Sequence, residues 1–160
     1  MKFAIFALSA TLAVAPLAAA PLLMPAVPDY VLAHSQKNAT GAIAEYVPRG
    51  QTVQNYSRMI TTNLLGGFGK VPSPALIKEF VTRYVATCPG AKVLAVPMGG
   101  SAGARIDCTR HPKTGKTETV FARAIPAGAD QYLAHITYRY IPMPKETQWA
   151  RSFLGAMKIG

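Results

Sequence analysis

The most regular hydrophobic pattern in the chain covers Leu76–Val85. Apolar residues recur there three and four positions apart, which is the spacing of one buried face of an α-helix. Ser73 is a suitable N-cap for this helix, Pro74 fits its first position, and Pro89-Gly90 ends it. The pattern therefore predicts an amphipathic helix whose charged side chains lie on its outer face.

Alternating apolar and polar residues predict strands before and after this helix. Glycine, proline and asparagine mark the turns between the strands, which is typical of antiparallel hairpins. Residues 51–65 allow two assignments, a helical turn capped by Thr52 or a turn followed by a strand, and the β-rich composition of 57–65 favours the second. The expected strands are 30–35, 42–47, 57–65, 92–97, 104–109, 117–125 and 131–141, and a second helix is expected over 145–157.

These elements predict an α+β fold. The strands cluster along the chain and the helices do not alternate with them, which favours an antiparallel sheet over a parallel one. We expect an N-terminal hairpin and a C-terminal meander to form this sheet. We also expect the two helices to pack on one face of it and to leave the other face partly exposed.

The first 20 residues have the features of a secretory signal peptide. Lys2 provides the positive charge, an apolar stretch follows, and Ala18–Ala20 forms a small-residue cleavage motif. Pro21 disfavours a cut after Ala20, so cleavage after Ala19 or near Ala26 is an alternative. An uncleaved membrane anchor is a second alternative, although the prolines around the motif argue against it. We predict a signal peptide over 1–20, a proline-rich spacer over 21–28 and one domain over 29–160.

The two cysteines predict a disulfide bond. Two cysteines in an exported chain usually pair, so we expect a bond between Cys88 and Cys108 that fixes the helix to the sheet. A reactive thiol is the alternative interpretation. Two cysteines without a neighbouring histidine pair do not provide a metal site, and we predict no metal and no cofactor.

The charge of the chain predicts an anionic partner. Seventeen lysine and arginine residues face seven acidic residues, which gives a net charge of +10. This balance favours membrane headgroups, polysaccharide phosphates or nucleic acid, but the lack of consecutive basic residues argues against a nucleic-acid partner. We expect Arg105, Arg123 and Arg139 to form a basic patch on the solvent face of the meander. The alternative is a solvated strand face without a ligand.

Catalytic signatures are weak in this sequence. His135 lies on a predicted strand, and a general acid or base there would need His34 or Glu118 as its partner. The acidic residues are dispersed singly, and the glycine-rich segment 66–70 lacks the spacing of a phosphate-binding loop. A histidine of this kind is more often structural than catalytic.

The segment EYVPRGQTVQNYSRMIT, over Glu45–Thr61, resembles the start of a domain found in uncharacterised secreted proteins of Gram-negative bacteria. That resemblance implies export but no activity. The order of elements is also similar to that of the photosystem II extrinsic subunits, which is an analogy of fold only.

Together these observations favour an exported, periplasmic or secreted, non-enzymatic domain that binds an anionic envelope component or a partner protein. The alternative is a small secreted hydrolase, of phosphodiester type, that uses His135 with His34 or Glu118. Two titratable groups converging in one cleft would favour the hydrolase.

Overall fold

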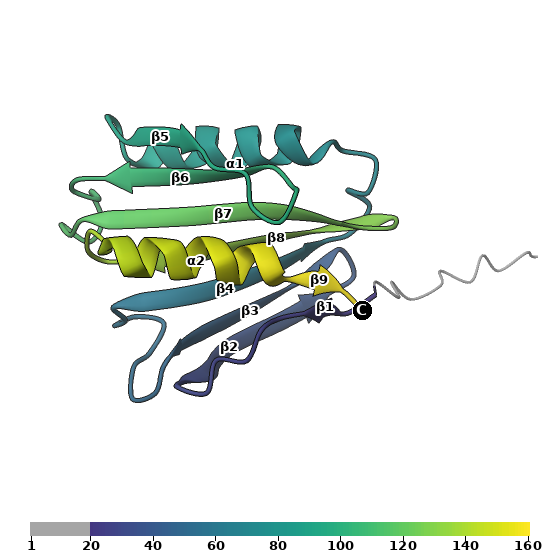
Figure 1. Cartoon of the computed structure of the whole chain (residues 1–160), viewed down its shortest axis with the longest axis horizontal. Helices are drawn as coiled ribbons and strands as arrows, with labels where there is room; N and C mark the ends of the chain where they lie inside the picture. The colour runs from purple at the N-terminus through teal and green to yellow at the C-terminus, as the bar shows by residue number, and fades with distance from the viewer. Residues whose placement is uncertain (1–19) are drawn as a thin grey trace, which may run out of the picture.

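A seven-stranded antiparallel sheet forms the centre of the molecule (Figure 1). The structure is a computed structural model and describes residues 20–160. The sheet has the strand order β2-β3-β4-β8-β7-β6-β5, and a small second sheet pairs β1 with β9. In chain order the elements are β1 (Leu22–Leu23), β2 (Tyr30–Asn38), β3 (Gly41–Pro48), β4 (Arg58–Leu65), α1 (Ser73–Thr87), β5 (Lys92–Ala95), β6 (Gly103–Cys108), β7 (Glu118–Ala127), β8 (Asp130–Tyr138), α2 (Pro144–Ala156) and β9 (Lys158–Ile159).

The predicted α+β class with an antiparallel sheet and two helices is confirmed. Two meanders, β2–β4 and β5–β8, join where β4 pairs with β8 at the centre of the sheet. The predicted spacer over 21–28 is instead part of the fold, because Leu22–Leu23 pair with Lys158–Ile159 and Met24 and Val27 pack against the main core. The predicted signal peptide lies, except for Ala20, outside the described residues.

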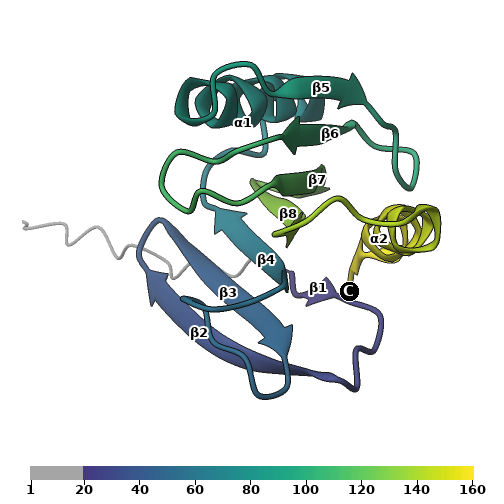
Figure 2. The ribbon, with the colours of Figure 1, turned by 90° about the vertical axis from the view of Figure 1, so that its left-hand side faces the viewer.

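The two helices lie on opposite faces of the sheet, so the prediction that both share one face is wrong (Figure 2). Strand β7 shows this directly, because alternate side chains of a strand point to opposite faces. Phe121 and Ile125 contact the α2 core, whereas Ala122 and Ala124 contact α1. Both parities of β7 are therefore buried, and the sheet forms the middle layer of three in this region.

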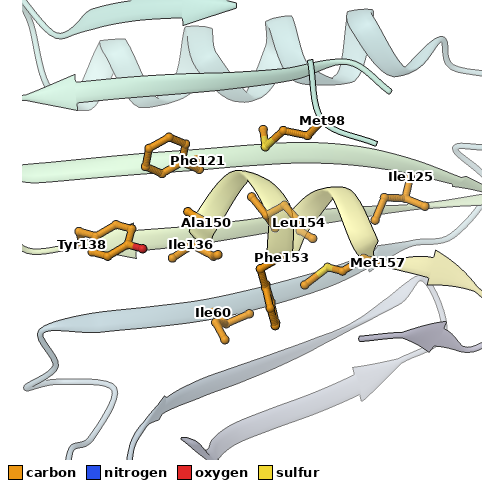
Figure 3. Close-up of a cluster of buried hydrophobic side chains, with 11 residues drawn as sticks. Ile60, Met98, Phe121, Ile125, Ile136, Tyr138, Ala150, Phe153, Leu154 and Met157 are labelled. Carbon is orange, nitrogen blue, oxygen red and sulfur yellow. The ribbon is translucent and has the colours of Figure 1, made fainter. Parts of the chain in front are cut away.

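The α2 face carries the larger apolar core (Figure 3). Phe153 and Leu154 of α2 point from the helix onto side chains of the central strands, such as Ile60 and Ile136. Trp149 packs near the edge of this core, where its ring stacks on Phe153 with 5.0 Å between ring centroids. This contact fixes the inner face of α2, and the opposite, polar face of the helix is turned toward solvent.

The α1 face is held by small side chains and by the disulfide. Leu76 and Ile77 of α1 pack on a floor that includes Ala104 and Ala122. Cys88 follows the helix and forms the predicted disulfide with Cys108, with 6.2 Å between the two Cα atoms. Such bonds form and persist in oxidising compartments, so this domain is consistent with an extracytoplasmic protein.

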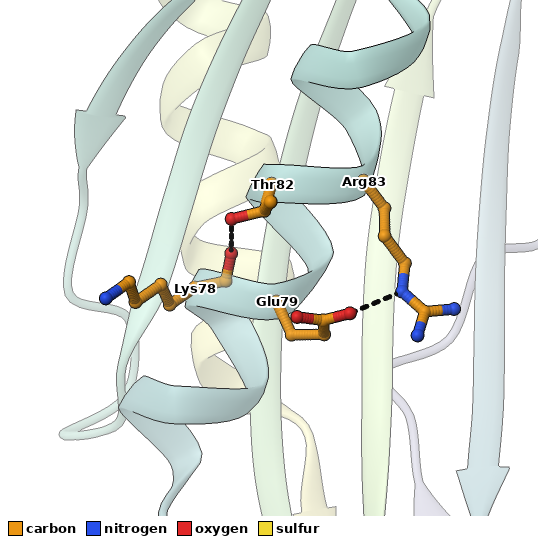
Figure 4. Close-up of polar contacts among 4 residues, drawn as sticks. All are labelled: Lys78, Glu79, Thr82 and Arg83. Atoms are coloured by element: carbon orange, nitrogen blue, oxygen red, sulfur yellow. Dashed lines mark hydrogen bonds and ion pairs between the residues drawn. The ribbon is translucent and has the colours of Figure 1, made fainter.

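Helix α1 begins one residue differently from the prediction. Ser73 is its first residue and not its N-cap; the N-cap position is Pro72, which provides no side-chain hydrogen bond. The outer face of α1 is charged as expected, and Arg83 forms an ion pair with Glu79 one turn earlier, at 2.6 Å (Figure 4). Both side chains are largely exposed, so this pair contributes little to stability.

Candidate functional site

The structure separates the three arginines that were expected to form one basic patch. Arg105 and Arg123 lie on the α2 face, because their cross-strand partners Phe121 and Gly103 belong to that face. Arg139 follows β8 on the α1 face, where its guanidinium lies 3.8 Å from the ring centroid of Tyr56. The three side chains therefore form no common surface, and each has to be considered by itself.

Arg123 is a buried structural residue, with only 5% of its surface exposed. Its Nη1 group donates hydrogen bonds to the carbonyl oxygens of Leu154, Gly155 and Met157 at the end of α2. Its Nη2 group donates to the carbonyl oxygen of Gly99 at 3.2 Å. The guanidinium thus caps the carboxyl end of α2 through its two Nη groups, and its Nε is buried away from solvent.

Arg139 is also committed to the protein. Besides its contact with Tyr56, it donates from Nη1 to the carbonyl oxygen of Gln54 at 2.9 Å. These contacts hold the loop between β3 and β4 over the apolar side chains of Val47 and Met59. The arginine therefore has a local structural role on the face opposite to Arg105.

Arg105 lines an open cleft of about 1010 Å³. The cleft opens between α2 and the loop that joins β5 to β6. Pro97, Met98 and Gly99 form the loop side, and Arg151 of α2 is the second arginine in the lining. A concave site with a few convergent polar groups is the usual form of a ligand site.

The polar face of α2 forms one wall of this cleft. The sequence places Thr147 and Gln148 one turn before Arg151 and Ser152, so all four side chains project from the same side of the helix. The opposite side of α2 is fixed on the core by Phe153 and Leu154. The amphipathic pattern of α2 therefore places hydroxyl, amide and guanidinium donors together in the cleft.

The loop wall is held close to α2 by a glycine. A Cβ atom at Gly99 would lie 2.2 Å from the carbonyl oxygen of Gly155 and 2.9 Å from Cζ of Arg123. Gly99 also has a positive φ of 55°, which side chains disfavour. A larger residue at position 99 would thus push the loop away from α2 and change the shape of the cleft.

The free positive charge of the cleft comes from Arg151, because Asp107 largely neutralises Arg105. Arg105 forms an ion pair with Asp107 at 3.0 Å, and the same carboxylate accepts a hydrogen bond from Thr119. Glu146 of α2 accepts hydrogen bonds from the hydroxyl of Tyr140 and the backbone N–H of Met143. Arg151 is exposed and forms no ion pair with any residue in 20–160, so its charge is available to a ligand.

The lining of the cleft is suited to binding an anion. The side chains of its lining that carry polar groups are arginine, threonine, glutamine and serine, and its described lining contains no histidine, cysteine or carboxylate. Guanidinium groups bind carboxylate and phosphate through two parallel hydrogen bonds. The described residues also contain no cluster of three potential metal ligands.

The histidine pair proposed for hydrolysis does not converge. His34, Glu45, Thr61 and His135 occupy one cross-strand row over β2, β3, β4 and β8. Three strand spacings separate the two histidines, which corresponds to about 14 Å. A general acid and a general base must each lie within hydrogen-bond distance of the reacting group, and at this separation the two histidines cannot do so together.

Glu118 is equally remote from His135. His135 pairs with Ala122 on β7, and Glu118 lies four residues before Ala122 at the start of that strand, about 13 Å along it. Its carboxylate instead accepts a hydrogen bond of 2.8 Å from the hydroxyl of Tyr84. Burial, together with this hydrogen bond, raises the pKa of Tyr84 above its usual range. Glu118 thus fastens α1 to the sheet.

Burial lowers the pKa of His135 to about 4. The ring lies against Phe80 of α1, with 5.4 Å between ring centroids. Its Nδ1 atom is buried and, within residues 20–160, has no hydrogen-bond partner, so no acceptor stabilises the charged form. His135 is therefore neutral at pH 7 and belongs to the packing of the α1 face.

Acid should destabilise the fold through His135. Its pKa in the unfolded chain is about 6.5, so the unfolded state takes up the proton first as the pH falls. The stabilisation by the neutral ring is complete above pH 6.5 and is lost toward pH 4. We expect a loss of about 2 kcal/mol, less than the full shift implies because part of the residue is exposed.

Urea unfolding between pH 7 and pH 4 measures this effect. In the wild type the free energy of unfolding should fall between pH 7 and pH 4, and His135→Gln should make this fall smaller by about 2 kcal/mol. His34→Gln, at an exposed position, should show the same fall as the wild type. If the free energy of unfolding of His135→Gln depends on pH as it does in the wild type, burial of the neutral His135 ring is not the cause of the acid destabilisation.

From the sequence, Arg105 is predicted as a candidate binding residue but Arg151, the second arginine in the lining, is not. The signal was present, because Thr147, Gln148, Arg151 and Ser152 share one side of the predicted helix. A polar helix face by itself indicates only contact with solvent. The face of α2 becomes the wall of a cleft because the loop between β5 and β6 lies opposite it, and the sequence does not show this loop position.

None of the helices in residues 20–160 is long and apolar enough to span a membrane. The chain matches no protein-family model, and a search of the curated proteins finds no match either, so its resemblance to secreted Gram-negative proteins stays a prediction.

Proposed function

We propose that this chain is an exported, periplasmic, non-enzymatic domain that binds an anionic component of the cell envelope in the cleft between α2 and the β5–β6 loop. The observation that carries this proposal is that Arg105 and Arg151 line one open cleft together with three uncharged polar side chains of α2. A phosphate-bearing headgroup matches this chemistry, since its oxygens accept several hydrogen bonds at once.

The two arginines have different roles in this proposal. Arg105 is partly neutralised by Asp107 and is held over Phe121, with its Cζ atom 5.4 Å from the ring centroid. It therefore presents a fixed, partly buried guanidinium to the cleft. Arg151 is exposed on α2 and supplies the charge that attracts the ligand.

Two further features support export and binding. The disulfide and the signal-like N-terminus agree with an oxidising compartment. The net charge of +10 favours association with anionic surfaces, and this attraction is reduced by salt. A role in hydrolysis has less support, because its proposed residues are dispersed over the opposite face.

Replacing Arg151 with glutamine tests the proposal. The mature protein is titrated with vesicles that contain phosphatidylglycerol, with lipopolysaccharide and with a short single-stranded oligonucleotide, at low and at physiological salt. We expect binding to a phosphate-bearing lipid that weakens with salt. Arg151→Gln should weaken it about tenfold, as expected for the loss of roughly 1.4 kcal/mol of charge-assisted bonding.

Arg110→Gln is the matched control, because Arg110 is an exposed arginine outside the cleft. It removes the same charge and should change the affinity less than twofold. Equal losses in the two variants would show that net charge, and not the cleft, determines binding. The absence of binding to every anion would contradict the proposed function.

A further inference from the structure

A second, apolar groove lies on the other face of the sheet, between α1 and the edge strand β5. Its volume is about 350 Å³. Ile77 and Val81 of α1 form one wall and Val93 of β5 forms the other. This groove shares only Pro97 with the lining of the arginine cleft and has no part in the function proposed above.

The groove exists because α1 covers β6 and β7 but leaves β5 open. The helix packs on Ala104 and Ala122, and its carboxyl end is fixed to β6 by the disulfide. Strand β5 pairs only with β6, all four of its residues are exposed, and Val93 retains 42% of its surface. The floor beside it consists of the small residues Ala95, Ala102 and Ala104, which leave space under the helix.

One charged residue, Lys78, lines this groove. It projects from α1 on the side away from the Glu79–Arg83 ion pair, and only its backbone carbonyl contacts Thr82 (Figure 4). Its ammonium forms no ion pair with any described residue. The groove therefore combines an apolar floor and walls with a single available cation at its rim.

We propose that this groove binds the hydrocarbon chain of an anionic amphiphile, with Lys78 facing the acidic headgroup. The charge complementarity of Lys78 selects an acidic head, and the aliphatic lining offers the chain no side-chain hydrogen-bonding group. A pocket of this volume is within the range of small-molecule sites. The occupant is thus a fatty-acid-like molecule, whose single acidic head matches the single available cation of the groove.

Titration with decanoate and with decyl maltoside, each below its micelle-forming concentration, tests this site. Isothermal calorimetry gives the affinity, and methyl NMR spectra locate the site at Val81 and Val93. We expect saturable binding of decanoate and weaker binding of the neutral decyl maltoside. Ala95→Leu should fill the groove and weaken both ligands more than tenfold, and Lys78→Gln should weaken decanoate about threefold without changing decyl maltoside.

Matched controls separate the groove from general surface effects. Ala86→Leu adds the same apolar group at an exposed position of α1, and Lys70→Gln removes an exposed lysine elsewhere. Both controls should bind like the wild type. Unchanged decanoate binding in Ala95→Leu, with an unchanged unfolding midpoint, would overturn the proposal, as would the lack of saturable binding in the wild type. Arg151→Gln should leave decanoate binding intact, so the two proposed sites can fail independently.

Discussion

Replacing Arg123 with methionine should lower the free energy of unfolding by about 3–5 kcal/mol. The guanidinium is the buried cap of α2, and its loss leaves the carbonyl oxygens of Leu154, Gly155 and Met157 without their donor. It also removes the link to Gly99 in the opposite wall of the cleft. Thermal and urea unfolding measure the change, which corresponds to a fall in melting temperature of about 10 °C for a domain of this size.

Two controls make this expectation specific. Arg110→Met removes an exposed arginine and should change stability by less than about 0.5 kcal/mol. Arg123→Lys keeps the charge but lacks the planar fork, so it cannot reach both the end of α2 and Gly99, and should recover only part of the loss. A stable Arg123→Met variant would show that the carbonyl groups find other partners and that the cap is dispensable.

Removing the disulfide should produce an effect of similar size. The bond joins residues 20 positions apart, and closing a loop of this length stabilises a fold by about 3 kcal/mol in the chain-entropy model. The double substitution Cys88→Ala with Cys108→Ala should therefore unfold at much lower urea concentration than the oxidised wild type. Both sulfurs belong to buried residues, so the missing atoms add a small packing loss.

Unfolding of the wild type and of the double alanine variant with and without a reductant provides the control for this prediction. Dithiothreitol should lower the unfolding midpoint of the wild type toward that of the double alanine variant and should leave the variant itself unchanged. If reduced and oxidised wild type unfold at the same urea concentration, the bond does not constrain the unfolded chain in the expected way.

The sequence predicts the elements that depend on local patterns. Helix α1 follows from the spacing of Leu76, Ile77 and Phe80, and the disulfide follows from two cysteines in a chain predicted to be exported. The hairpins follow from their turn residues, with boundaries that differ by a few positions. Strand β1 could not be predicted from local pattern, because a strand of two residues is too short to show alternation. Its pairing with β9 also depends on residues at the other end of the domain.

The placement of the two helices on opposite faces depends on non-local packing, although the sequence of β7 indicates that both faces of the sheet are covered. Its segment Val120–Ile125 is apolar at both parities except for Arg123, and such a run indicates a strand buried on both faces. An arginine within such a strand is therefore expected to be buried and hydrogen-bonded, and not to be part of a solvent patch. Arg105 is only partly exposed, because it lies over Phe121 on the α2 face and is paired with Asp107.

The pairing of β4 with β8 has a consequence for the folding kinetics of the chain. Each meander forms from neighbours in sequence, but Asn63 meets Leu133 only after a loop of 70 residues has closed. The disulfide shortens this loop by 20 residues, which reduces the entropy of closure by only about 0.3 kcal/mol. The seam between the two halves is therefore expected to be the slow, late step in both redox states. Because the disulfide lies within the half that forms earlier, oxidation should mainly accelerate folding and change the unfolding rate little.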